Sequence, residues 1–285
     1  MATPMTAAQF ARALRAEGLN VHERSGWSTH NRGQRGTGWG PLNGVMIHHT
    51  ASGDGKGIVD LCYSGRADLP GPLCHGVIHK NGEVTLVGWG RANHAGTGDA
   101  DALDAVINES AHHPKPGRGT VDGNSRFVGF ECVNRGDGKD PWPEAQLVAI
   151  ARAAAAVCRH YGWGEHSVIG HLEWTNQKID PAGFSMNSMR DRIAAVLAAP
   201  AGRIPEEDDM QLNDQVGIGD WMPRRWPDDK GLADKKISVG TALGSAYGHA
   251  RVAHEGVDVL RKEVAELRDQ VTQILTLLTE TGDPS

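Results

Sequence analysis

The sequence predicts an α/β fold, with a mixed central β-sheet flanked by helices and followed by a linker and a C-terminal coiled-coil helix. Short apolar runs bounded by turn residues alternate with segments of helical periodicity, a pattern typical of a helix-covered sheet. Near the C-terminus, apolar residues recur at heptad spacing. We expect an N-terminal helix and irregular approach segment over 1–43, the main domain over 44–199, a linker with room for a small module over 200–249, and a coiled-coil oligomerisation helix over 250–285.

The first helix is expected over residues 6–17. Phe10, Ala11 and Leu14 lie there at helical spacing, and Gly18 follows as a stop signal. The next segment is rich in Gly, Ser, Thr and Asn, which predicts an irregular approach to the first strand of the main domain.

Five short apolar runs predict the strands of the main domain. They are Gly44–His48, Gly76–His79, Val84–Val87, Phe127–Cys132 and Val168–Ile169. The turn Lys80-Asn81-Gly82 indicates that the second and third strands form a hairpin. Two helices are expected after the fourth and fifth strands, over Pro143–His160 and Met186–Leu197.

Two histidines and one aspartate follow these strands in a pattern that favours a metal site. His48 closes an apolar run, His171 is expected to end the short strand that begins at Val168, and Asp180 precedes Pro181, which favours an extended or turn conformation. Two imidazoles and one carboxylate leave a fourth zinc position open for water, as in hydrolytic sites. The alternative is that these are ordinary structural residues; His49, the adjacent competitor, should point to the opposite face of its strand.

Five short motifs carry a resemblance to a known family. They are Ile47-His48-His49-Thr50-Ala51, Cys74-His75-Gly76-Val77-Ile78, Asn93-His94-Ala95-Gly96, Val128-Gly129-Phe130-Glu131, and His171 with Lys178-Ile179-Asp180-Pro181. From about Val45 to about Ala198 the chain resembles the zinc-dependent N-acetylmuramoyl-L-alanine amidases of the peptidoglycan-recognition and phage-lysozyme type. The resemblance implies peptidoglycan as the substrate, Zn²⁺ as the cofactor, and His48, His171 and Asp180 as its ligands.

The same resemblance implies roles for four further residues. Glu131 is expected to be the general base, and Lys178 to stabilise the oxyanion that forms on the attacked carbonyl. Some relatives use a tyrosine as base at the position of Cys74, which is a poor substitute, so Glu131 becomes the more necessary candidate. His75 and His94 are expected to contact substrate or to orient neighbouring groups. For Glu131 and Lys178 the alternatives are a surface glutamate on an edge strand and a solvated loop lysine.

Other histidines and the cysteines receive no role in this chemistry. His112 and His113 lie in a Pro- and Gly-rich stretch that predicts a solvated loop. The four cysteines lack Cys-x-x-Cys spacing and fit reduced core thiols, with a Cys62–Cys74 bridge as the alternative.

Composition and charge restrict the partners. A formal net charge of −6 without a basic stripe argues against nucleic acid. No stretch approaches the roughly 18 apolar residues of a membrane span, and the N-terminus lacks the features of a secretory signal peptide. Together with the resemblance, this fits a phage endolysin that stays in the host cytoplasm without a signal peptide and is released to the cell wall at lysis.

Two other functions are compatible with the same motifs. A protein of this fold could bind peptidoglycan without cleaving it, although such relatives usually lack a metal ligand. A zinc peptidase acting within the stem peptide would need the same ligands and the same oxyanion donor, so ligand identity does not separate it from an amidase.

Heptads predict self-association through residues 257–281. One seam position holds Val257, Val264, Val271 and Leu278, and the other holds Leu260, Leu267 and Ile274. Val at one position with Leu at the other favours parallel dimers, whereas Leu275 and Leu277 widen the apolar face and favour three or four chains.

Deleting residues 257–285 is therefore expected to give a monomer that still cuts soluble wall fragments but lyses whole cells less well. Sedimentation at micromolar concentration measures the oligomeric state. A monomeric full-length chain would contradict the prediction.

A second product of the same gene is a further hypothesis. Glu206-Glu207-Asp208-Asp209 precedes Met210. If both glutamates are encoded GAG, the resulting purine run resembles a ribosome-binding site, and the two aspartate codons place it six nucleotides before the Met210 codon. An internal start there would yield a fragment 210–285 that carries the heptads and joins the oligomer. The alternative is an acidic, solvated linker, as charge runs usually are. Intact mass of the products of the native gene tests this, because a single full-length species would exclude the fragment.

Overall fold

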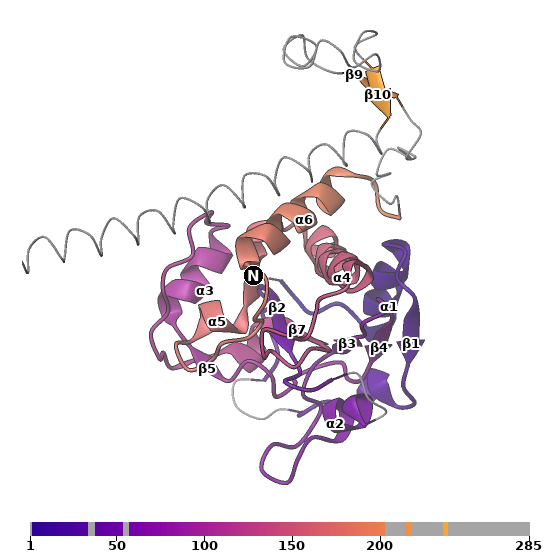
Figure 1. The fold of residues 1–285 in the computed structure, drawn as a ribbon. Coiled ribbons are helices and arrows are strands. Elements are labelled where there is room, and N and C mark those ends of the chain that lie inside the picture. The colour runs from indigo at the N-terminus through magenta and orange to yellow at the C-terminus, as the bar shows by residue number, and fades with distance from the viewer. Residues whose placement is uncertain (1, 34–37, 54–56, 203–214, 218–235, 239–285) are drawn as a thin grey trace, which may run out of the picture. The chain divides into compact units, whose positions relative to one another are not determined.

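The computed structural model describes residues 2–33, 38–53, 57–202, 215–217 and 236–238 (Figure 1). The chain divides into two compact units, Met1–Glu206 and Glu207–Ser285. In the second unit, β9 (Gln215–Gly217) and β10 (Lys236–Ser238) form an antiparallel pair. The coiled coil predicted over 250–285, Met210 and most of the predicted linker lie outside the described residues, so these predictions stay untested.

The first unit is built on a six-stranded sheet with the order β1-β4-β3-β7-β2-β8 (Figure 1). The strands are β1 Val21–Glu23, β2 Gly44–His49, β3 Gly76–Ile78, β4 Val84–Leu86, β7 Phe127–Cys132 and β8 Val168–Gly170. β3 and β4 pair antiparallel, as the predicted hairpin requires, while the other neighbours in this sheet run parallel. The sheet is mixed, which confirms the predicted fold class.

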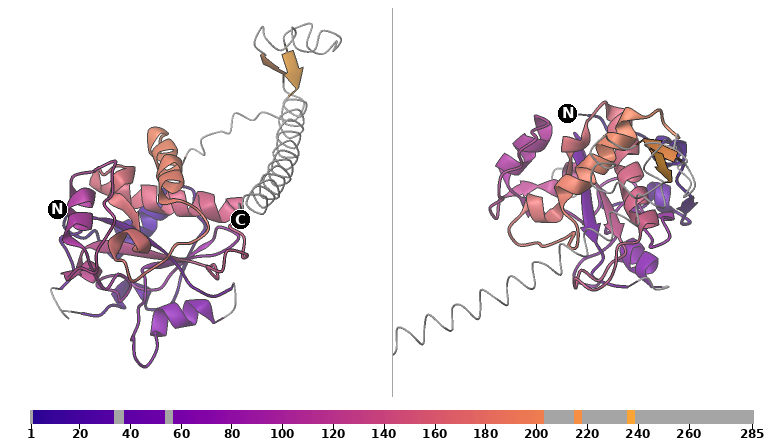
Figure 2. Two further views of the ribbon diagram at one scale, coloured as in Figure 1. Left: turned by 60° about the vertical axis from the view of Figure 1, so that its left-hand side comes forward. Right: turned by 45° about the horizontal axis from the view of Figure 1, so that its top comes forward.

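Helices cover both faces of this sheet (Figures 1 and 2). The helices are α1 Ala7–Ala16, α2 Ile58–Ser64, α3 Ala100–Ile107, α4 Glu144–Tyr161, α5 His171–Trp174 and α6 Met186–Ala198. Alternate residues of β2 enter different clusters: Val45 and Ile47 pack with α1, α4 and α6, whereas Met46 packs with α3 and α5. A strand covered on both faces is apolar throughout, which explains why the sequence predicts β2 so clearly.

Helix ends follow ordinary capping rules. Thr6 caps α1 and forms a capping box with Gln9, and Phe10 and Leu14 are fully buried as predicted. α4 ends at Gly162, which adopts the left-handed conformation that favours glycine. Both helices predicted in the main domain are confirmed within a residue or two.

Sequence reasoning did not predict several short elements. These are β1, α2, α3, α5 and a small antiparallel pair of β5 (Thr97–Gly98) with β6 (Val121–Asp122). Each is short, so hydrophobic periodicity carries little signal there. One expectation needs correction: His171 does not end a strand, because β8 stops at Gly170 and His171 is the first residue of α5.

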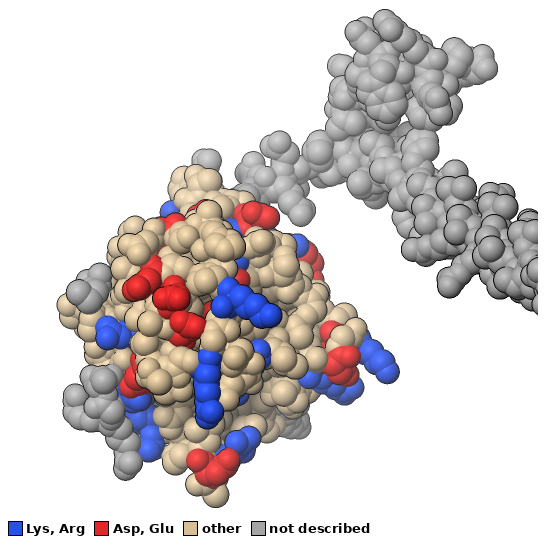
Figure 3. All heavy atoms as spheres, turned by 90° about the vertical axis from the view of Figure 1, so that its left-hand side faces the viewer, with Lys and Arg blue, Asp and Glu red and all other residues tan. Residues whose placement is uncertain are grey.

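Two further observations bear on the predicted partners. Figure 3 shows one face of the first unit, on which basic and acidic side chains are interspersed. Among the described helices, none has the length and apolar character needed to cross a membrane.

The four cysteines, Cys62, Cys74, Cys132 and Cys158, are free thiols and are buried.

Candidate metal centre

Strand register brings His48 and His171 to the same edge of the sheet. β2 and β8 are parallel neighbours in which Ile47 pairs with Gly170, so the residue after each of these lies at a carboxyl end. Ligand sites in open α/β sheets form at such ends. Asp180 joins them from a loop that returns to α5, where its carbonyl accepts a hydrogen bond from the amide of Leu172 at 2.7 Å.

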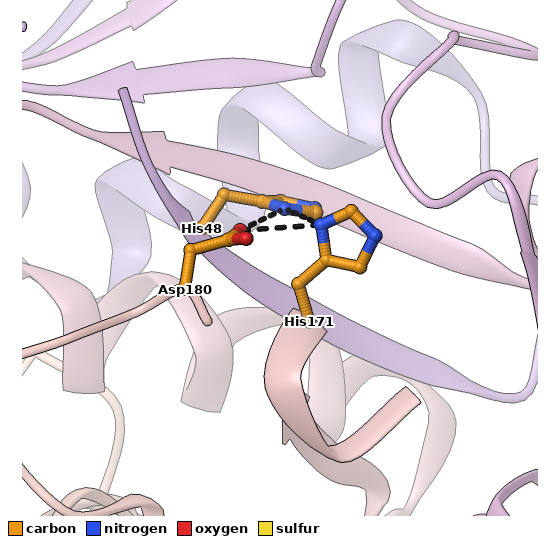
Figure 4. Close-up of side chains that lie close together, drawn as sticks. All are labelled: His48, His171 and Asp180. Carbon is orange, nitrogen blue, oxygen red and sulfur yellow. Dashed lines mark hydrogen bonds and ion pairs between the residues drawn. The ribbon is translucent and has the colours of Figure 1, made fainter. Parts of the chain in front are cut away.

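The three predicted ligands converge on one point (Figure 4). His48 Nδ1 lies 3.0 Å from His171 Nδ1 and 3.0 Å from Asp180 Oδ2, and His171 Nδ1 lies 3.2 Å from Asp180 Oδ2. All three residues are buried. In a tetrahedral zinc site with bonds of about 2.0–2.1 Å, the ligand atoms lie about 3.3–3.4 Å apart. The three ligand atoms here lie slightly closer together than that, so their spacing suits such an ion.

The tautomer of His171 is fixed by its other ring nitrogen. His171 Nε2 lies 3.1 Å from the carbonyl oxygen of Ala95. A carbonyl only accepts hydrogen bonds, so Nε2 carries the proton and Nδ1 presents a lone pair to the shared point.

The tautomer of His48 is fixed in the same way, through a hydrogen bond to His94. His94 Nε2 lies 3.2 Å from the carbonyl oxygen of Phe127 and must donate, which leaves His94 Nδ1 as an acceptor. His48 Nε2, 3.1 Å from that acceptor, therefore carries the proton and His48 Nδ1 presents a lone pair. Burial lowers the pKa of His48 to about 4, so the ring is neutral at pH 7.

Hydrogen bonding alone does not account for this arrangement. Two imidazole lone pairs and an acceptor-only carboxylate face one another at about hydrogen-bond distance, with no proton left to share between them. A cation at the shared point would accept the lone pairs of both imidazoles and of the carboxylate at once. A neutral imidazole whose other nitrogen donates a hydrogen bond to the protein is the form that binds metal. The residues therefore fit a metal ion of the zinc type.

A comparison with protein families identifies the region that contains this cluster. The family model described as N-acetylmuramoyl-L-alanine amidase matches residues 38–183, just over half of the chain and all the residues of the cluster. The chain belongs to the N-acetylmuramoyl-L-alanine amidase family. A comparison with curated proteins gives no match.

Solved structures similar to the amidase chain share little of its sequence. An endolysin amidase from Clostridium intestinale is 13% identical with a TM-score of 0.40, covering 61% of this chain and 95% of that one. The hydrolase AmiA of Staphylococcus aureus, in complex with its ligand, is 15% identical with a TM-score of 0.41, covering 68% and 93%. The Drosophila peptidoglycan recognition protein PGRP-SA is 16% identical with a TM-score of 0.39, covering 61% and 91%.

Glu131 stands beside the ligand cluster of the amidase domain. It pairs with His48 across β7 and β2, and cross-strand partners project to the same face. β7 lies inside the sheet, which excludes the alternative of an edge-strand glutamate. Burial raises the pKa of Glu131 well above its ordinary value, and the nearby Asp180 adds to the shift. Its Oε2 is buried and has no hydrogen-bond partner among the described residues, which leaves it available to a water in the site.

A cavity of about 260 Å³ opens onto the cluster and contains both predicted catalytic residues in its lining. Lys178 is exposed and reaches this cavity from the loop that leads to Asp180. A second cavity of about 240 Å³ is also lined by His94, His171 and Lys178. The two cavities share His94, His171 and Lys178 in their linings, so both adjoin the ligand cluster.

The two histidines predicted to contact substrate occupy different places. His94 is partly exposed and lines both cavities. His75 is fully buried: its Nδ1 accepts from the amide of Gly129 at 2.9 Å, and its Nε2 donates to the carbonyl of Gly90 at 2.8 Å. His75 therefore offers no surface to a substrate, because the residue is buried and both of its ring nitrogens bond to backbone groups.

Three histidines outside the ligand cluster also carry predictions from their sequence positions. His49 is not a member of the ligand cluster, although it lines the same cavity; its Nδ1 accepts from the amide of Ala182 at 3.2 Å. His112 is exposed in an irregular loop, as predicted. The prediction was wrong for His113, which is half-buried and has both ring nitrogens buried without a hydrogen-bond partner among the described residues. Sequence reasoning missed the cavity-lining residues of α2 and the loop after it, such as Leu61, Arg66 and Leu69, since no motif marks them.

Proposed function

We propose that this protein is a zinc-dependent N-acetylmuramoyl-L-alanine amidase that cleaves the amide between N-acetylmuramic acid and L-alanine of peptidoglycan. One observation carries the proposal: within the region matched by the amidase family, the lone pairs of His48 and His171 and the carboxylate of Asp180 meet at 3.0–3.2 Å. When bound there, zinc supplies an acidified water near neutral pH and a Lewis acid for the carbonyl.

Protein side chains would carry the proton and the developing charge. Glu131, held next to His48, accepts the proton of the attacking water while the water oxygen bonds to the carbonyl carbon. Lys178 faces the cavity and stabilises the resulting oxyanion. Glu131 then returns the proton to the leaving amine as the carbon–nitrogen bond breaks. The raised pKa of Glu131 suits this double role, because a strong acid would not hold the proton.

Digestion of purified peptidoglycan tests the proposal and separates it from the two alternatives. An amidase produces free L-alanine amino termini and glycan strands whose N-acetylmuramic acid residues carry unsubstituted lactyl carboxylates, both of which mass spectrometry detects. Cleavage within the stem peptide would instead identify a zinc peptidase. Binding to the wall without any new termini, from protein loaded with zinc, would identify a binding protein. Release from a host cytoplasm at lysis, as a phage endolysin, stays a prediction that lysis assays in producing cells can check.

A further inference from the structure

One side-chain oxygen holds three consecutive backbone amides beside the metal centre. Asn124 Oδ1 accepts from the amides of His94 at 3.0 Å, Ala95 at 2.8 Å and Gly96 at 3.2 Å. Three successive amides reach one acceptor only where the chain curls around it, and Gly96 adopts a left-handed φ of 58° at this point. Asn124 is itself held by Asp122, whose Oδ1 accepts from the amide of Asn124 at 3.2 Å.

The loop fixed in this way supplies the outer partner of both histidine ligands. The carbonyl of Ala95 accepts from His171 Nε2, and the adjacent side chain of His94 accepts from His48 Nε2. Two neighbouring residues of one loop therefore determine which nitrogen of each imidazole faces the metal. Such outer partners commonly change metal affinity by about 10–100-fold when they are lost.

Strand β7 also restricts the position of the His94 ring. A side chain at Gly129 of β7 would place its first carbon 2.4 Å from His94 Nδ1, so the ring packs directly on the strand backbone. Its Nε2 is tied to the carbonyl of Phe127 on the same strand. The position of His94 is therefore fixed at two points: its ring packs on β7, and its backbone amide is bound by Asn124.

We propose that Asn124 is a positioning residue that sets the tautomers of His48 and His171 through the loop His94–Gly96. The proposal rests on the proposed function for the identity of the metal, but the tautomers themselves exist without it. Asn124 touches neither ligand, so its effect must travel through the two hydrogen bonds of the loop. It also lines the second cavity, which makes direct contact with substrate the competing explanation.

The experiment compares Asn124→Ala with Asn124→Asp. The alanine variant removes the acceptor, whereas the aspartate variant keeps an oxygen for the three amides. Asn31→Ala is the matched control, because Asn31 also anchors a loop, through bonds to Thr29, Trp89 and Gly33. Long-range ¹H–¹⁵N correlation spectra of the zinc-free proteins report the imidazole tautomers directly, and competition with a chelator measures zinc affinity.

For wild type we expect the Nε2–H tautomer at both ligands. Asn124→Ala should mix the tautomers and weaken zinc binding by about 10–100-fold, while Asn124→Asp stays close to wild type and Asn31→Ala changes neither quantity. Unchanged tautomers and unchanged zinc affinity in folded Asn124→Ala would overturn the inference. If that variant changed only the KM for a soluble muropeptide, direct contact with substrate would be the explanation instead. A wild-type protein that shows the expected tautomers but binds no zinc would instead overturn the proposed function.

Discussion

Alanine in place of His48, His171 or Asp180 is expected to abolish zinc retention and wall hydrolysis. Each change removes one of three donors that lie 3.0–3.2 Å apart, and two remaining donors cannot hold an ion in the geometry that hydrolytic zinc requires. The variants should also melt at lower temperature than the zinc-loaded wild type, because metal that binds only the folded state adds to its free energy of unfolding. Metal content per mole of protein and release of wall fragments measure the two effects.

His112→Ala is the matched control for these variants. His112 is an exposed histidine of an irregular loop, outside the ligand cluster, so its loss should leave zinc content and hydrolysis unchanged. Full activity of all three ligand variants after chelator treatment would place the site elsewhere in the chain.

Glu131→Gln is expected to lower turnover by about 10²–10⁴-fold while zinc stays bound. Glutamine keeps the size of the side chain but cannot accept a proton. The glutamate is neither a ligand nor an edge residue, so folding should remain near normal. Steady-state kinetics on a soluble muropeptide substrate and metal analysis of the same sample provide the measurement.

The pH dependence of the wild type gives a second view of Glu131. Its pKa lies well above the ordinary value because the carboxyl is buried. Only the carboxylate accepts a proton, so activity should be present above this raised pKa and fall as the pH drops through it. Glu83→Gln, a change at a partly exposed hairpin residue outside the ligand cluster, should retain both turnover and the profile. Near wild-type turnover of Glu131→Gln would remove Glu131 from the mechanism.

Prediction from sequence succeeded where the pattern is local and strong. β2 and β7 are buried on both faces and therefore appear as unbroken apolar runs, and α4 is long enough for helical periodicity to be clear. α5, by contrast, has four residues and begins directly after β8, so it left no periodic signal and His171 was assigned to a strand end. The prediction that His171 is a ligand does not depend on this error, because both assignments place His171 at the same edge of the sheet.

The sequence by itself determined the mixed α/β class, the family resemblance and the three residue types that suit zinc. Only the tertiary structure decided that Nδ1 of each histidine faces Asp180 and the other imidazole, that Glu131 lies inside the sheet, and that His75 is fully buried. The physical reason is that these properties depend on contacts between distant segments: His48 and His171 are 123 positions apart and meet only through the register of β2 with β8. The partners that orient their rings come from a third segment, the loop held by Asn124, whose place no local pattern encodes.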